Sequence, residues 1–337
     1  MYYTSVLQNQ TCETEKSRIP GIVCTKTGKL LAYCEERHGE GGDWAKIDIV
    51  LKKNTDNGET WSDRCVLVEN DGHTINNPVM IVGKDNTIHF IWHREYAEAY
   101  YQKSIDEGES WSEPVDITNV FEEFRSQYNW EVIASGPGHG ICCSDGKLVV
   151  PVWLSVSKKH MPSVSASIYS DDDGATWKIG KIFPEGDVIS PNETTAVELS
   201  NKNILFNYRN MTPNHKRAIA VTDDIANNLE YLGFDEQLLD AWCFGSLASA
   251  TYNGEHLVFF ANCRYETTDR YNLTIRCSKD DCKTWNNGIV IAPWGGYPDI
   301  CVNEETGELF CYYEHVDDGI MSLKVMRIPV EDIISAE

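Results

Sequence analysis

One turn motif recurs along the chain and constrains its fold more than any other feature. It has the form Asp-x-Gly-x-Thr/Ser-Trp, with Ser or Asn two residues before the aspartate. The copies occupy residues 54–61, 104–111, 170–177 and 278–285, and in the last one Cys282 replaces the glycine. Each copy follows a short apolar run typical of a β-strand, so each is predicted to lie in a β-hairpin.

The residues of this motif, hereafter the Asp box, predict a structural role. Aspartate can accept hydrogen bonds from backbone N–H groups, glycine supplies a positive φ, and Ser or Thr adds another side-chain bond to the backbone. We therefore interpret the aspartates as turn residues, and not as catalytic groups or calcium ligands.

The spacing of the boxes predicts the architecture. Successive box tryptophans lie 50, 66 and 108 residues apart, and the last interval corresponds to two repeats. Such a period suits one four-stranded blade with its loops, so the chain holds roughly six units, within the usual range for a propeller. No Pro/Gly/Ser-rich linker divides the sequence. We predict an all-β fold, a six-bladed β-propeller with Asp-box hairpins, as one domain over residues 1–337.

The charge balance excludes some classes of partner. The chain has 29 Lys and Arg against 52 Asp and Glu, a formal net charge of −23. Such a protein repels nucleic-acid phosphates and anionic lipid surfaces, so we expect no nucleic-acid or membrane partner. An anionic ligand would need a local basic pocket.

The N-terminus and the cysteines bear on the cellular compartment. The first residues lack the basic region and the apolar run of a signal peptide. Twelve cysteines are scattered, mostly within apolar runs, which favours reduced thiols over a disulfide framework. We predict a cytoplasmic protein, or a secreted one if a leader was trimmed from the chain.

Arginines recur at the ends of predicted inner strands, namely Arg18, Arg37, Arg209 and Arg270. Three guanidinium groups converging from separate blades would form a carboxylate clamp with a bidentate geometry that lysine cannot copy. The alternative interpretation is that each arginine is an ordinary surface ion-pair partner.

Three further residues carry candidate chemistry: Asp43 in a glycine-rich loop, Glu193 just before a strand, and Tyr297 in a loop before the last hairpin. A Tyr–Glu pair suits attack on a cationic centre beside a carboxylate. A neutral phenol activated by a base avoids the repulsion that a carboxylate nucleophile would meet there.

An ordered set of motifs extends over nearly the whole chain. It comprises Arg18-Ile-Pro, the Asp boxes, Gly136-Pro-Gly-His-Gly-Ile, then Asp145-Gly-Lys-Leu-Val-Val-Pro, and Cys243-Phe-Gly-Ser. In these motifs the chain resembles the bacterial exo-α-sialidases of the six-bladed propeller superfamily. The resemblance implies a retaining glycoside hydrolase that releases terminal α-linked sialic acid from sialylated oligosaccharides or glycoconjugates, with no cofactor and no catalytic metal.

The same resemblance implies a role for each candidate residue. The substrate-binding residues would be Arg18, Arg209 and Arg270 at the sugar carboxylate, and Arg37 near the 4-hydroxyl. Asp43 would be the general acid and base, Glu193 would activate Tyr297 as the nucleophile, and Glu314 would hold Arg18 in place.

Some assignments have alternatives. Pro298 follows Tyr297 where the family usually has serine, so Tyr312 and Tyr313 stay open as nucleophiles. Arg264 competes with Arg270, although the Asn-Leu-Thr segment after Arg270 favours the latter. The candidates for the pocket of the sugar's N-acyl group are Trp44, Trp130 and Asn77, and a structural role is the favoured alternative for each.

Two other functions remain open for such a chain. One is a propeller glycosidase or lyase that acts on another acidic sugar. The other is a non-catalytic sugar-binding propeller that has kept the arginines. The presence of both Asp43 and Glu193 favours an enzyme over a binding protein.

Overall fold

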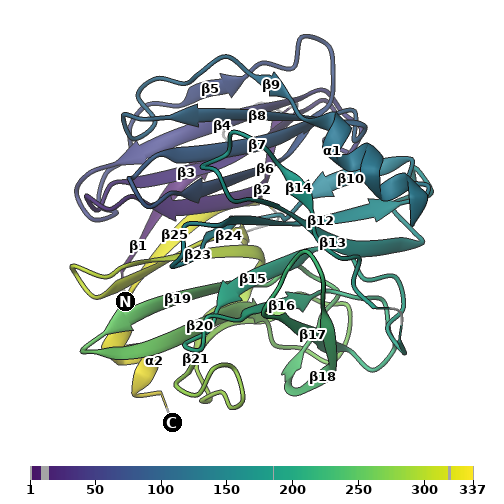
Figure 1. Ribbon diagram of the computed structural model, residues 1–337. Helices are drawn as coiled ribbons and strands as arrows, with labels where there is room; N and C mark the ends of the chain where they lie inside the picture. The colour runs from purple at the N-terminus through teal and green to yellow at the C-terminus, as the bar shows by residue number, and fades with distance from the viewer. Residues whose placement is uncertain (1, 9–14, 185, 318–319, 337) are drawn as a thin grey trace.

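β-Strands make up nearly all the regular structure of the chain. The computed structural model describes residues 2–8, 15–184, 186–317 and 320–336. Its strands form six antiparallel sheets arranged as the blades of a propeller, so the predicted fold class is confirmed (Figure 1).

Five of the blades follow one another along the chain, each running from an inner to an outer strand. Blade 1 contains β2 (Glu15–Cys24), β3 (Leu30–His38), β4 (Ile47–Asn54) and β5 (Cys65–Val68). Blade 2 contains β6 (Ile75–Val82), β7 (Ile88–Arg94), β8 (Glu98–Ser104) and β9 (Val115–Asp116). Blade 3 contains β10 (Val132–Ser135), β12 (Leu148–Ser155), β13 (Ser163–Ser170) and β14 (Lys178–Ile179), with β11 (Ile141–Cys142) beside β12. Blade 4 contains β15 (Thr194–Glu198), β16 (Ile204–Tyr208), β17 (Lys216–Thr222) and β18 (Glu230–Leu239). Blade 5 contains β19 (Ser246–Tyr252), β20 (Glu255–Cys263), β21 (Tyr271–Ser278) and β22 (Ile289–Trp294).

Blade 6 closes the ring with strands from both ends of the chain. Its inner three strands are β23 (Gly296–Asn303), β24 (Glu308–Asp317) and β25 (Ile320–Pro329). The outer strand is β1 (Tyr2–Gln8), which pairs antiparallel with β25, and Figure 1 shows this purple strand beside the yellow ones. Backbone hydrogen bonds thus join the two ends of the chain within blade 6, and apolar side chains pack between blades 6 and 1. The short helices are α1 (Thr118–Glu122), a 3₁₀ turn (Glu123–Ser126) and α2 (Val330–Ile334).

The Asp boxes form the predicted turns. In the second box Asp106 accepts hydrogen bonds from the N–H of Ser110 at 2.8 Å and from its hydroxyl at 2.5 Å. Ser104 Oγ accepts from the N–H of Gly108 at 2.8 Å. The third box repeats these three contacts around Asp172. The side chains of the aspartate and of the serine or threonine are therefore used within the turn itself, which supports a structural role for the box.

The two altered boxes keep the same geometry. The Asn54 amide oxygen accepts from the N–H of Gly58 at 2.8 Å while its nitrogen donates to Asp56, so the amide replaces the hydroxyl of serine in both roles. Cys282 adopts φ +65°, close to the left-handed conformation of the box glycines, and its side chain is buried between blades.

Apolar side chains fill the space between adjacent blades. The Trp177 ring, 7% exposed, packs edge-on against Tyr101 of blade 2 with 5.7 Å between ring centroids. The same cluster includes Leu148, Val150 and Val152 of β12. The box tryptophan thus ties its hairpin to the preceding blade.

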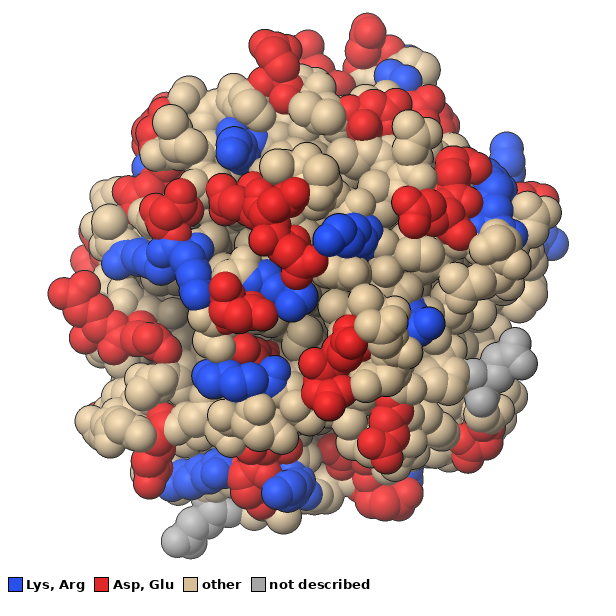
Figure 2. All heavy atoms as spheres, viewed as in Figure 1, with Lys and Arg blue, Asp and Glu red and all other residues tan. Residues whose placement is uncertain are grey.

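The surface is rich in acidic side chains, and the described cysteines are reduced, as the composition predicts. Figure 2 shows acidic side chains over much of the visible face, with basic ones among them. The eleven cysteines in the described part of the chain are all free thiols, and Cys12 lies outside it. In the described residues no helix is long and apolar enough to cross a membrane.

Replacing Trp177 with alanine should lower the free energy of unfolding by about 3–5 kcal/mol, because it removes a large buried ring between two blades. Chemical denaturation followed by circular dichroism would measure this. Ile105→Ala, at an 82% exposed position of another box, is the control and should change little. Equal stabilities of the two variants would contradict the packing role.

Candidate active site

A cavity of about 230 Å³ holds most of the predicted site residues. Its lining includes Arg18, Arg37, Asp43, Glu193, Arg209 and Tyr297, and among the other residues Ile19, Asn77, Tyr96, Trp153, His160 and Met211. These residues come from inner strands, from second strands and from loops next to strands of several blades. Of the four arginines predicted at inner-strand ends, only Arg18 lies on an inner strand, β2; Arg37 lies on β3, and Arg209 and Arg270 lie beside β16 and β21. The predicted convergence of distant segments is therefore present in the structure.

Tyr297, Glu193 and Arg209 form one hydrogen-bonded group. The Tyr297 hydroxyl donates to Glu193 Oε1 at 2.7 Å, and Arg209 Nη1 donates to Glu193 Oε2 at 2.5 Å and to the Tyr297 oxygen at 3.2 Å. The β15–β16 hairpin sets this geometry, because the N–H of Arg209 bonds to the carbonyl of Glu193 at 2.9 Å. Burial and the charge of Glu193 raise the pKa of the phenol, although Arg209 and Arg270 oppose the shift.

Glu314 joins the other two arginines of the predicted triad. Its side chain has no exposed surface, and Oε1 accepts from Arg18 Nε at 2.5 Å and from the N–H of Ile19 at 3.2 Å. Arg270 Nη1 lies 3.6 Å from Oε2. Burial raises the pKa of Glu314, but Arg18 and Arg270 outweigh it and the pKa falls below its usual range. The predicted contact of Glu314 with Arg18 is thus present.

The arginines surround the phenol ring of Tyr297. The guanidinium carbon of Arg270 lies 4.9 Å from the ring centroid, and that of Arg18 lies 5.4 Å from it. Arg264, the alternative, is exposed and donates to the carbonyl of Asn287 at 3.3 Å. The structure therefore places Arg270, and not Arg264, in the cluster.

Arg37 and Asp43 form an ion pair on another side of the cavity. Arg37 Nη1 donates to Asp43 Oδ1 at 2.7 Å, while its Nε donates to Glu35 Oε2 at 2.8 Å. Burial raises the pKa of Asp43, but the Arg37 guanidinium and its hydrogen bond lower it more, so the net shift is downward. Sequence reasoning missed Glu35, which is fully buried and also accepts from the N–H of Asn77 at 2.8 Å.

Tyr96, Trp153 and His160 form an aromatic wall of the cavity that the sequence did not reveal. His160 packs against Tyr96 and Trp153 with ring centroids 4.7 and 5.2 Å apart. Its Nδ1 lies 4.0 Å from Asp43 Oδ2. Trp44, a predicted pocket residue, packs against Tyr96 with tilted rings 4.8 Å apart between centroids, is 41% exposed and is not among the residues that line the cavity. His160 has a positive φ of +64°.

The remaining alternatives are resolved by position. Tyr312 is fully buried in the apolar cluster between blades 6 and 1, and Tyr313 packs in the cluster between blades 5 and 6, so neither lines the cavity. Trp130 is also buried, and its indole N–H donates to the carbonyl of Phe121 at 2.9 Å, so its prediction as a pocket residue is wrong. Asn77 lines the cavity.

Three inner strands share one backbone feature at the residue that lines the cavity, a positive φ directly before a proline. Ile19, Asn77 and Tyr297 have φ of +56°, +51° and +44°, and each precedes a proline. Each lies where the ladder register shifts, between Arg18 and Gly21, Asn76 and Val79, and Gly296 and Asp299. Positive φ is uncommon at non-glycine residues outside turns and is costly for bulky or β-branched ones such as Ile19 and Tyr297, and such strain clusters at functional sites.

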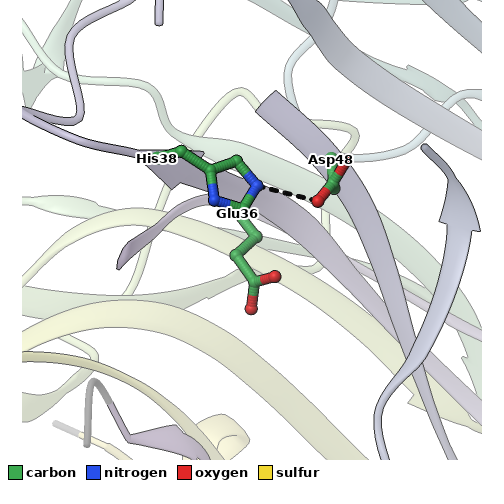
Figure 3. Close-up of side chains that lie close together, drawn as sticks. All are labelled: Glu36, His38 and Asp48. Carbon is green, nitrogen blue, oxygen red and sulfur yellow. Dashed lines mark hydrogen bonds and ion pairs between the residues drawn. The ribbon is translucent and has the colours of Figure 1, made fainter. Parts of the chain in front are cut away.

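A possible cation site elsewhere is occupied by the chain's own groups. Glu36, His38 and Asp48 place one ligand atom each within 4.8 Å of one another, and Figure 3 shows the His38–Asp48 contact, 2.8 Å long. Both oxygens of Glu36 bind Arg64, and Asp48 Oδ1 accepts from the N–H and the amide of Asn70 at 2.6 Å. Because these oxygens already have partners within the chain, the three residues do not fit a metal site.

The chain is a six-bladed propeller whose cavity is lined by arginines and holds a Tyr–Glu pair. Residues 28–311 match the BNR repeat-like domain family, and the chain belongs to that family. A sialidase of Bacteroides fragilis is 27% identical over 304 residues, which cover 80% of this chain and 54% of that protein. A sialidase of Paraclostridium sordellii is 26% identical over 346 residues, covering 91% of this chain and 83% of the relative.

The fold also matches solved structures. The Hadza microbial sialidase superposes with a TM-score of 0.80 at 22% identity, covering 94% of this chain and 66% of that one. The chain thus spans about half the length of the Bacteroides fragilis relative and about two thirds of the Hadza protein.

Replacing Glu314 with glutamine should lower the free energy of unfolding at neutral pH by about 3 kcal/mol, because it leaves Arg18 and Arg270 without their buried anion. Since the folded-state pKa lies below the ordinary 4.5, the carboxylate stabilises the fold above that pH. The difference between native protein and variant should therefore shrink as the pH falls through the folded pKa. Denaturation at several pH values measures this, and a difference independent of pH would contradict it.

Proposed function

We propose that the protein is a retaining exo-α-sialidase that releases terminal α-linked sialic acid from glycoconjugates. The observation that supports this most directly is the 2.7 Å hydrogen bond between Tyr297 and Glu193, in a cavity that also holds Arg18, Arg209 and Asp43. The names of the Bacteroides fragilis and Paraclostridium sordellii relatives support the same reaction.

The arginine cluster suits the carboxylate of the sugar. In the described part of the chain, Arg18 uses only Nε in a hydrogen bond, and Arg209 Nε is buried with no partner. The ion-pair partner of Arg270 in the described residues is Glu314, at 3.6 Å. The remaining N–H groups can bind an anion, while the acids behind the arginines hold their positions.

Tyr297 is the nucleophile and Glu193 its general base. Because burial and Glu193 raise the pKa of the phenol, free phenolate is rare at neutral pH. The proton must therefore pass to Glu193 as the oxygen attacks the anomeric carbon. The bond to the leaving oxygen breaks, a glycosyl–tyrosine intermediate forms, and Arg209 stabilises the charge on the phenol oxygen.

Asp43 is the general acid and then the general base. It protonates the leaving oxygen and later removes a proton from the water that releases the sugar, which retains the anomeric configuration. The Arg37 pair favours the ionised form of Asp43. An anionic substrate nearby favours the protonated form, so binding the sugar itself prepares the acid.

Replacing Tyr297 with phenylalanine should lower the turnover of an aryl α-sialoside by at least about 10²-fold, because the nucleophilic oxygen is lost. Release of the aryl group measures this. Tyr312→Phe is the matched control, since that phenol lies in the core away from the cavity, and it should keep its activity. Loss of turnover in Tyr312→Phe alone would indicate that Tyr297 is not the nucleophile. No turnover by the native protein would contradict the proposed function.

Replacing Asp43 with alanine should slow a natural sialoside by roughly 10²-fold or more and an activated aryl sialoside much less, because only the poor leaving group needs a proton. Comparing kcat/KM for the two substrates measures this. Asp48→Ala, in the trio outside the cavity, is the control and should not discriminate between them. Equal losses on both substrates in Asp43→Ala would contradict the acid role.

A further inference from the structure

Cys243 lies directly behind the proposed nucleophile. It belongs to the connection between β18 and β19, is 3% exposed, and its Sγ accepts a hydrogen bond from the N–H of Tyr297 at 3.3 Å. Tyr297 has the costly φ of +44°, so this bond helps to hold a strained backbone in place. The catalytic cycle described above assigns no role to this thiol.

The thiol also faces the arginine that has the weakest carboxylate partner. Arg18 and Arg209 are each 2.5 Å from a carboxylate oxygen, whereas Arg270 lies 3.6 Å from the nearest one. A β-carbon at Gly296 would lie 3.3 Å from Arg270 Nη1 and 3.6 Å from Cys243 Sγ. Both groups therefore border Gly296, which places no side chain of its own between the guanidinium and the sulfur.

The surroundings of the sulfur favour an anion. Burial raises the pKa of the Cys243 thiol, but the neighbouring Cys263 thiol, the charge of Arg270 and the Tyr297 N–H lower it, to about 7. The Cys263 S–H can point to the carbonyl of Gly295, 3.0 Å away, or to Cys243. The titratable and charged groups facing Cys243 from the surrounding segments are Arg209, Arg217, Asp240, Cys263, Arg270 and Tyr297.

Of these groups, Asp240 is the carboxylate, and it pairs with Arg217 at 3.4 Å. Arg209 is held by Glu193. Arg270, whose nearest carboxylate oxygen is Glu314 Oε2 at 3.6 Å, is therefore the neighbouring cation with the weakest carboxylate partner. Cys243 raises the pKa of that guanidinium more than any other neighbour does.

We propose that Cys243 is a positioning residue of the site, whose thiolate is the counterion of Arg270 and holds the backbone of Tyr297. The thiolate competes with the carboxylate of the sugar for Arg270, so affinity for the sugar falls as the pH rises through neutrality. The second statement rests on the proposed function, whereas the first concerns the protein alone. By reciprocity, a bound sugar carboxylate makes the thiol harder to ionise.

The first experiment needs no turnover. The ultraviolet absorbance of thiolate is titrated against pH for the native protein, Cys243→Ser and Cys277→Ser, the last being a buried thiol remote from the cavity. We expect one thiolate transition near neutrality in the native protein and in Cys277→Ser, absent from Cys243→Ser. Adding N-acetylneuraminic acid should move that transition to higher pH. No transition near neutrality, or one that persists in Cys243→Ser, would overturn the inference.

The second experiment measures binding of N-acetylneuraminic acid by calorimetry from mildly acidic to mildly alkaline pH. The Kd of the native protein should rise about tenfold across neutrality, within the usual range for coupled sites. Serine can still accept the Tyr297 N–H but does not ionise there, so Cys243→Ser should bind with a much flatter pH dependence. KM for the aryl sialoside should follow the same pattern. Equal pH dependence in both proteins would overturn the competition.

Failure of the proposed function has a different signature. A native protein that neither turns over the aryl sialoside nor binds the sugar would refute the sialidase proposal and with it the competition. The thiolate titration without sugar would still decide the charge on Cys243. If Cys243→Ser does not fold, the native titration with and without sugar remains decisive, because only a thiol next to the bound carboxylate should shift.

Discussion

Two carboxylates without exposed surface, Asp299 and Glu314, hold the inner strands around the axis of the propeller. Asp299 on β23 accepts from the N–H of Ile22 in blade 1 at 2.8 Å, from Ser246 of blade 5 at 2.7 Å and from His139 at 2.8 Å. Glu314 binds Arg18 of blade 1 and faces Arg270 of blade 5. Burying a charge is costly unless the charge is paired, so these contacts fix the relative positions of the blades as well as the arginines.

The same need for exact placement explains the strained residues on the inner strands. Ile19, Asn77 and Tyr297 each combine a positive φ with a following proline at a shift in strand register. A bulge leaves a residue outside the ladder, so the missing N–H of proline costs nothing there. All three residues line the cavity. Pro298 is therefore no obstacle to a nucleophile at Tyr297, because it repeats the arrangement of blades 1 and 2.

Local patterns in the sequence were enough to predict the fold, and the family resemblance predicted many of the site residues. The Asp boxes are complete within eight residues, which is why their turns and the blade count could be predicted. Glu35, Tyr96, Trp153 and His160 lie among ordinary strand and loop sequence and acquire their place only when separate blades meet. Trp130 illustrates the opposite error, since its ring serves the core beneath α1, and an aromatic residue looks the same in sequence whether it faces a core or a cavity.

A protein with a net charge of −23 that binds an anion must overcome its own field. At physiological ionic strength that field is screened beyond roughly 8 Å, so the groups lining the cavity decide the outcome. There each arginine is already paired, Arg18 with Glu314, Arg209 with Glu193 and Arg37 with Glu35 and Asp43. These acids keep the guanidinium groups in position but also compete with the ligand for them. The affinity of such a site for an anionic sugar therefore depends on how far each acid lies from the N–H groups that face the cavity. A counterion that can be protonated, such as a thiolate, makes that competition depend on pH.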